Sequence, residues 1–177
     1  EIARTMYPLM SKSKNNEPSQ EQLANIIQLY KHGDLATLLI FATYLLSDFP
    51  NSIALHNFLG ICHTKLGNFK AAIENYKILI IYNPQDCDSY FNLANLHMDV
   101  GEYDDALIGY QKILKINSTD FDAYNNMGIC WKQKGDFDNA INSFQRAIEL
   151  NPKFTIAHEN LSKALDAIAK SETGIRG

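Results

Sequence analysis

The sequence predicts an all-α solenoid of stacked helical hairpins, and two repeated patterns predict it. Four of the nine glycines recur at intervals of 34 residues, namely Gly33, Gly67, Gly101 and Gly135. Three of the five prolines lie on a second series with the same 34-residue interval, namely Pro50, Pro84 and Pro152, and Ser118 fills the remaining position. A fixed period of this length indicates a repeat protein in which neighbouring hairpins share a continuous core.

Numbering each repeat so that its glycine takes position 15 divides the chain into regular segments. The four repeats are 19–52, 53–86, 87–120 and 121–154. A segment at 155–170 with apolar residues between charges is expected to be a capping helix, because polar end helices keep solenoids soluble. Residues 1–18 are expected to be a flexible lead-in, in which Met10 begins a polar stretch typical of a natural protein start. Residues 171–177 are expected to fray.

The repeat at 121–154 shows why this spacing makes a hairpin. Tyr124, Gly128 and Trp131 follow one face of a first helix. Gly135 can end that helix because glycine adopts positive φ without a side-chain clash. A second apolar stripe then runs to Asn151-Pro152, where proline disfavours a helical conformation for the residue before it. Each repeat is therefore predicted to be two antiparallel helices.

The repeated positions resemble the tetratricopeptide repeat. That family has an aromatic residue at position 4, Leu at 7, Gly at 8, Tyr at 11, Ala at 20, Phe at 24 and Pro at 32. The repeat at 121–154 matches it best, with Tyr124, Met127, Gly128, Trp131, Ala140, Phe144 and Pro152. The first repeat departs most. The resemblance implies a right-handed stack of about nine helices, with the first helices lining a concave face, and a protein-interaction scaffold without enzymatic activity.

The resemblance also implies which positions face the concave groove, and asparagine recurs among them. Position 6 holds Asn92, Asn126 and Asn160 in three consecutive segments. An asparagine side chain offers both donors and an acceptor, so a row of them can bind the N–H and C=O groups of an extended peptide. The arrangement resembles the asparagine ladder of O-linked N-acetylglucosamine transferases. The alternative is that asparagine is tolerated on a solvated helix, although it is a mediocre helix former.

Other groove positions complete the predicted peptide-binding site. Further amides are Asn57, Asn95 and Asn125. Toward the N-terminal end, Phe58 and Ile61 predict an apolar pocket, which also includes Leu23 and Ile27. The family's carboxylate clamp for acidic tails requires basic residues in the groove. Its slots here hold residues such as Ile61 and Asp122, so binding of acidic tails is not expected.

Composition argues against several other classes of function. The net charge is −4 with 20% charged residues, so nucleic acid is a poor partner. The chain lacks an apolar run of about 18 residues and an export signal, so no membrane partner is expected. The three widely spaced cysteines, Cys62, Cys87 and Cys130, predict reduced thiols and a cytoplasmic location. The histidines His56, His63, His97 and His158 occupy aromatic packing positions, and no metal or cofactor is expected.

Three functions remain open at this stage. The leading one is a scaffold that binds an extended protein or peptide segment in its groove. The second is an N-terminal module of a larger glycosyltransferase or sulfotransferase-type enzyme, whose catalytic domain would follow residue 177. The third is self-association through the apolar surface of the degenerate first repeat.

Overall fold

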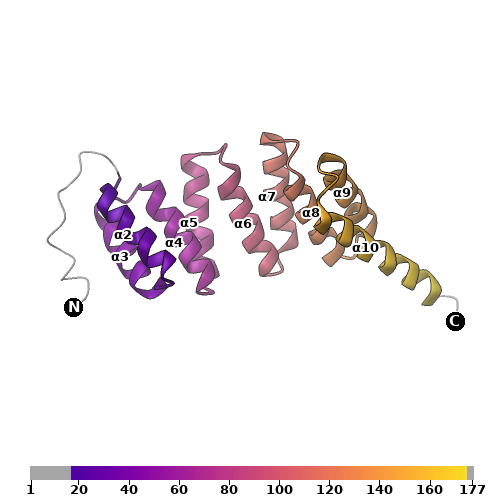
Figure 1. The fold of residues 1–177 in the computed structure, drawn as a ribbon, viewed down its shortest axis with the longest axis horizontal. Helices are drawn as coiled ribbons and strands as arrows, with labels where there is room; N and C mark the ends of the chain where they lie inside the picture. The colour runs from indigo at the N-terminus through magenta and orange to yellow at the C-terminus, as the bar shows by residue number, and fades with distance from the viewer. Residues whose placement is uncertain (1–16, 175–177) are drawn as a thin grey trace. The chain divides into compact units, whose positions relative to one another are not determined.

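The computed structural model describes residues 17–174, and in that range the chain forms an all-α helical-repeat solenoid (Figure 1). The described residues contain nine helices and no strand. The helices are α2 (Gln20–Lys31), α3 (Leu35–Asp48), α4 (Ile53–Lys65), α5 (Phe69–Tyr82), α6 (Cys87–Asp99), α7 (Tyr103–Ile116), α8 (Phe121–Gln133), α9 (Phe137–Leu150) and α10 (Thr155–Gly174). They form two compact units that divide after Pro84. We call α2–α5 the N-terminal unit and α6–α10 the C-terminal unit.

The turn inside each hairpin is built by the repeated glycine. Gly101 has a φ of 83°, and its N–H donates to the Met98 carbonyl at 3.1 Å. The N–H of Glu102 then donates to the His97 carbonyl at 2.8 Å. This pair of bonds is the Schellman motif, which satisfies the last carbonyls of a helix. The same bonds recur at the other three glycines of the series. The glycines that recur every 34 residues therefore mark the end of the first helix in each hairpin.

The connections between hairpins use different chemistry. Asn83 and Asn151 end α5 and α9, and a proline follows each of them and prevents the helix from continuing. The first helices α4, α6 and α8 each begin on a side-chain cap. At α8, for example, the Asp120 carboxylate accepts from the Ala123 N–H at 2.8 Å. Such caps satisfy backbone donors that have no partner inside the helix.

The core of the N-terminal unit lies between α2, α3 and α4. Its fully buried members include Ile26, Leu38 and Leu55, and Phe58 packs against this cluster while remaining partly exposed. Glu17 accepts from the Ile53 N–H at 2.8 Å, and Pro18 is buried. These two residues, which the sequence placed in the lead-in, therefore belong to the folded unit. The rest of the expected lead-in, including Met10, lies outside the described residues.

The core of the C-terminal unit depends on close approach inside each hairpin. A Cβ atom on Gly128 would lie 2.5 Å from Cε1 of Phe144, which is fully buried. In the preceding hairpin the closely packed glycine lies on the second helix instead of the first. Ala94 occupies the slot of Gly128, and a Cβ on Gly109 would meet the Ala94 Cβ at 2.7 Å. Gly109 and Gly128 therefore both stand where the facing helix leaves no room for a methyl group.

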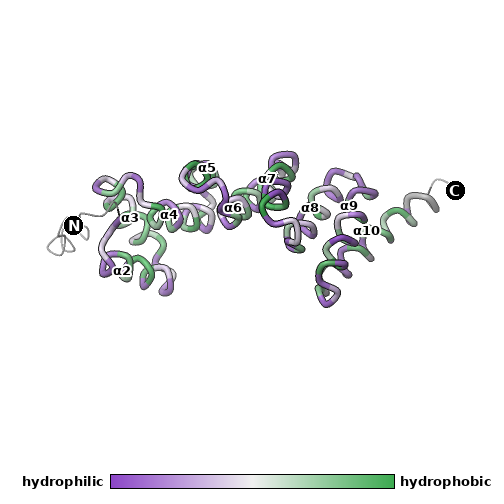
Figure 2. The backbone as a smooth tube through the Cα atoms, turned by 90° about the horizontal axis from the view of Figure 1, so that it is seen from above, coloured by the Kyte–Doolittle hydropathy of each residue, from purple (hydrophilic) through white to green (hydrophobic). Residues whose placement is uncertain are grey.

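The last helix is longer than the sequence indicated. It extends to Gly174, past the expected end at 170, and it packs against α9. Figure 2 shows apolar and polar residues alternating along the helices, as expected for amphipathic elements that each bury one face. Among the described residues, no helix is long and apolar enough to cross a membrane.

Candidate functional site

Four of the five predicted asparagines of the C-terminal unit form a continuous hydrogen-bonded network. The Nδ2 atom of Asn160 on α10 donates to Oδ1 of Asn125 on α8 at 3.0 Å. Asn125 donates to the neighbouring Asn126 at 3.1 Å. Asn126 donates in turn to Oδ1 of Asn95 on α6, also at 3.1 Å. Three first helices are thus joined by side-chain amides, and we call these four residues the amide network.

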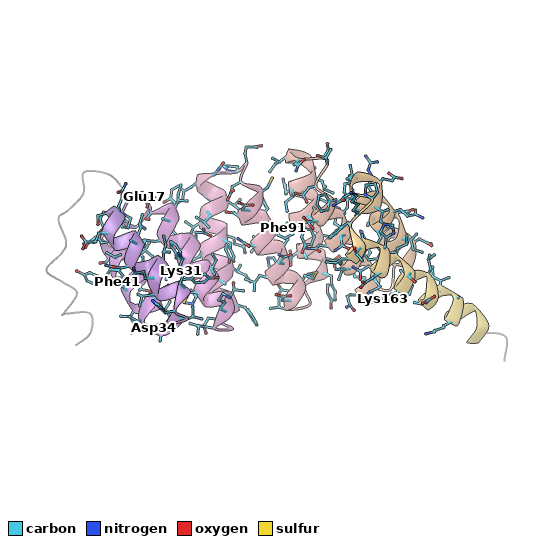
Figure 3. The ribbon with its side chains drawn as sticks, in the orientation of Figure 1. Glu17, Lys31, Asp34, Phe41, Phe91 and Lys163 are labelled. Carbon is cyan, nitrogen blue, oxygen red and sulfur yellow. The ribbon has the colours of Figure 1, made fainter. Side chains whose placement is uncertain are left out.

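A tyrosine from a second helix completes the network. The hydroxyl of Tyr110 on α7 donates to Oδ1 of Asn95 at 2.6 Å. Tyr110 is fully buried, and its ring meets Phe91 on α6 edge-on, with centroids 5.9 Å apart. Figure 3 labels Phe91 on α6 and Lys163 on α10, the two outer helices joined by the network. Burial raises the pKa of Tyr110 well above its usual value, so its hydroxyl remains a donor.

The structure divides the predicted asparagines into different roles. Asn95, Asn126 and Asn160 are partly exposed and belong to the network. Asn125, predicted as a groove-facing residue, is only 4% exposed and links its neighbours from within. Asn92 is partly exposed and takes no part in the network. The predicted row of asparagines at position 6 is therefore not the network that forms. On α6 the network uses Asn95, at position 9, in place of Asn92.

The predicted positions of the N-terminal unit are apolar or isolated. Asn57 on α4 is exposed, and Phe58 and Ile61 on the same helix are partly buried. Ile27 on α2 is 39% exposed. Surface hollows in this unit lie at the α4–α5 turn, lined by residues that include His63, Asn68 and Glu74. That location differs from the predicted apolar pocket, which stays a prediction.

Acidic side chains flank the network on α6 and α8. Asp122 is exposed and lies one helical turn before Asn126, on the same face. Its pKa is raised, first by burial and then by the nearby Asp120 carboxylate. Asp99 is exposed one turn after Asn95, and its charge acts on the Tyr110 hydroxyl. On α10, Lys163 and Glu159 approach to 4.0 Å and balance one another.

One group of metal-ligating side chains comes together in the described residues, although the sequence indicated none. His97, Glu102 and Asp105 offer ligand atoms within 4.8 Å of one another. The His97 Nδ1 and Glu102 Oε2 atoms are 2.6 Å apart, whereas two ligands on a tetrahedral zinc with bonds of about 2.0–2.1 Å lie about 3.3 Å apart. The pair is therefore a direct hydrogen bond that joins the end of α6 to the start of α7.

Other reactive side chains have structural partners. His56 uses both ring nitrogens, toward Asn75 at 2.9 Å and the Pro50 carbonyl at 3.0 Å. Cys62 and Cys130 are buried free thiols, and burial raises the pKa of Cys130 to about 11. A thiol with a raised pKa is a poor nucleophile. These side chains have structural roles, so the amide network remains as the candidate functional site.

Comparison with known proteins identifies the repeat. Models of the tetratricopeptide repeat match residues 45–121 and 121–154, which together are more than half of the chain. No curated protein matches the sequence at a significant level. Among solved structures, a MamA from Desulfovibrio magneticus is 14% identical, with a TM-score of 0.79 over 94% of this chain and 92% of its own.

Two further structures show the same fold. A tetratricopeptide repeat protein from Parabacteroides merdae is 22% identical, with a TM-score of 0.75 over 88% of this chain and 60% of its own. The first such domain of Spaghetti (RPAP3), bound to the HSP90 peptide SRMEEVD, is 22% identical, with a TM-score of 0.59 over 62% of this chain and 87% of its own.

Proposed function

Because the chain belongs to the tetratricopeptide repeat family, we propose that it is a protein-interaction scaffold whose C-terminal unit binds an extended peptide segment. The observation that carries the proposal is the amide network across α6, α8 and α10. Each side-chain amide has two N–H donors and a carbonyl. Only some of these groups are used within the network, and the partly exposed Asn95, Asn126 and Asn160 keep others for a ligand.

The chemistry of this surface suits main-chain recognition. An extended peptide presents one N–H and one C=O per residue, and uncharged amides pair with both. The network also holds the asparagines in place before binding. Less side-chain entropy is then lost when a ligand arrives. Recognition of this kind tolerates many side chains, which suits a scaffold.

The proposed ligand differs from that of the HSP90-bound relative. The peptide in that structure, SRMEEVD, carries three acidic side chains and ends in aspartate. In this chain Asp122 occupies a groove slot where the family's clamp requires a basic residue, and Asp99 lies beside Asn95. Like charges disfavour such a complex. We therefore expect SRMEEVD to bind poorly, and it serves as a negative probe.

A display experiment tests the proposal. A library of random twelve-residue peptides is selected on the full chain, and the affinity of the enriched peptide is measured by calorimetry. The double variant N126A/N160A should weaken binding about tenfold or more, since each neutral hydrogen bond contributes about 0.5–1.5 kcal/mol. Asn142 is exposed on α9 and lies outside the network, so N142A should bind normally. An unchanged affinity in the double variant would refute the proposal.

A further inference from the structure

We infer that α10 carries a second binding surface, which docks an amphipathic helix of another protein with the spacing Ala-x-x-Gly-aromatic. This surface consists of His158, Ser162 and Leu165, and we call it the open face of α10. The three residues are three or four positions apart, so they share one side of the helix. Asn160 of the amide network lies about half a turn away from His158 and Ser162. The open face is therefore separate from the proposed peptide site.

The first step is that α10 has the register of a first helix but not its cover. Positions 3 and 10, held here by Ala157 and Ala164, are buried in α10 as they are in α4, α6 and α8. Positions 4, 8 and 11 are buried or partly buried in α4, α6 and α8, and in α10 they are exposed. Leu165, at position 11, is 50% exposed. The loss of burial is thus confined to one side of α10.

A repeated hydrogen bond shows that α10 begins in the same way as a covered first helix. His158 and His56 both stand at position 4. Nε2 of His158 donates to the Pro152 carbonyl at 3.0 Å, and Nε2 of His56 donates to the Pro50 carbonyl at the same distance. His56 is buried, whereas His158 is exposed. The two helices therefore present the same side, and only α4 has a second helix packed on it.

The second step is that the turn that would fold a second helix onto α10 is missing from the described residues. The four other hairpins of the series turn at a glycine with positive φ at position 15. In the last segment Ala169 holds that position, and a residue with a Cβ disfavours positive φ. The helix accordingly continues to Gly174 and projects past α9 (Figure 1). The open face is therefore left for a helix of another chain.

The third step identifies the helix that fits, from the crossings that this chain already contains. Each such crossing has one glycine. In α8 it is on the first helix, where a Cβ on Gly128 would lie 2.5 Å from the Phe144 ring. In the α6–α7 hairpin the first helix carries Ala94, and the glycine is Gly109 on the second helix, where a Cβ would lie 2.7 Å from the Ala94 Cβ. Ser162 stands in the slot of Ala94 and carries a Cβ, so the docking helix has to provide the glycine.

The helix α7 therefore defines the chemistry of the partner. Its Ala106 and Tyr110, which flank Gly109 in the spacing Ala-x-x-Gly-Tyr, are both fully buried against the core of the C-terminal unit. On α10 the apolar contact for such residues is Leu165, which stands in the slot of Trp131. Covering Leu165 removes apolar surface from water and favours association. An amphipathic helix with this spacing satisfies both the close contact at Ser162 and the apolar contact at Leu165.

A peptide with the sequence of residues 103–116 is the probe. A free helix of this length is marginal in water, so a covalent bridge joins its positions 111 and 115, which are exposed in the chain. The peptide is titrated into the 15N-labelled full chain. We expect the backbone signals of Ser162 and Leu165 to shift. The G109S peptide should bind about tenfold more weakly, because its added atoms meet Ser162.

Protein variants test the same contact from the other side. L165D should weaken binding of the 103–116 peptide about tenfold or more. I156D is the matched control, because Ile156 is 55% exposed on the side of α10 that carries Asn160, and it should bind normally. S162G moves the glycine to α10, so it should restore binding of the G109S peptide to within about threefold of the original pair. N126A/N160A should leave this binding unchanged.

Other results would overturn the inference. Absence of shifts on α10, or shifts confined to α6, would show that the open face does not bind the helix. Equal binding of the G109S peptide, or failure of S162G to restore its binding, would show that the assigned ligand class is wrong. Sedimentation of the full chain as a dimer that L165D makes monomeric would show that a second copy covers this face. None of these results bears on the amide network, which the N126A/N160A test with the library peptide decides.

Discussion

The two units place the same ring in the same slot and use its hydroxyl differently. Tyr76 and Tyr110 are separated by one repeat, and each is buried. Burial raises the pKa of Tyr76, and a hydrogen bond to Thr64 partly offsets this effect. The hydroxyl of Tyr110 instead reaches Asn95 and joins the amide network. Packing therefore fixes the position of the ring in each repeat, whereas the hydrogen-bond partner of its hydroxyl differs between repeats.

The positions that the family resemblance assigns to the concave face differ in the same way. Where α6 and α8 carry Asn95 and Asn126, the matching positions of α4 carry Ile61 and Phe58. The backbone turns around them are equivalent, since Gly67, Gly101 and Gly135 all adopt positive φ and make the same bonds. The residues at these partly exposed positions thus differ between the units, while turn and core residues kept their types. Three predictions test how far the units are alike.

The largest effect should come from removing the buried ring of either unit. F144A should destabilise the protein by about 3–5 kcal/mol, because it leaves a cavity beside Gly128. Y76A should do the same in the N-terminal unit. Hydrogen exchange resolved by residue is the measurement. We expect protection to fall mainly in the unit that carries the substitution, and an equal loss across both would show that they unfold together.

A smaller effect should come from adding a methyl group at the facing glycine. The Cβ of alanine would lie 2.5 Å from the Phe144 ring in G128A and 2.8 Å from the Tyr76 ring in G60A. Overpacking costs about 1–3 kcal/mol, and the higher helix propensity of alanine returns about 0.8–1.0 kcal/mol of this. Urea unfolding should show a lower free energy of unfolding for both variants, and the lower of the two for G128A. Greater stability in either would mean that the helices separate without cost.

The smallest effect should be a local pH dependence at the start of α9 that the matching start of α5 lacks. Hydrogen bonds to the side chain and backbone of Asn139 lower the pKa of Asp136, the cap of α9. Since the folded-state pKa lies below the ordinary value of 3.8, the cap contributes fully above that pH and is lost as the pH falls through the lowered pKa. Asn68, its counterpart on α5, makes no side-chain cap bond and does not titrate.

Amide chemical shifts measure this difference directly. The Asn139 N–H signal should titrate below pH 3.8 in the wild-type chain and stay constant in D136N, which keeps a capping oxygen. The Ala71 N–H, at the matching place on α5, should not respond. A titration that persists in D136N would assign the effect to another carboxylate.

Much of the site followed from the sequence, but its connections did not. The resemblance of the repeat placed Asn95, Asn126 and Asn160 on first helices, and the structure finds them there, on α6, α8 and α10. The resemblance gave no signal that Asn125 is buried, or that Asn95 joins the network in place of Asn92. The bond between Tyr110 and Asn95 spans 15 residues and two helices. A hydroxyl at position 24 facing an asparagine at position 9 is the pattern that would have indicated it.

The sequence alone determined the hairpins, because helix ends depend on neighbouring residues. A glycine at positive φ, an Asn-Pro pair or a capping aspartate acts within about one helical turn, and each can be recognised where it stands. Only the tertiary structure decided which amides meet, because a hydrogen bond requires donor and acceptor within about 3.2 Å. The distance and rotation between packed helices set that condition, and here they depend on close contacts such as that between Ala94 and Gly109.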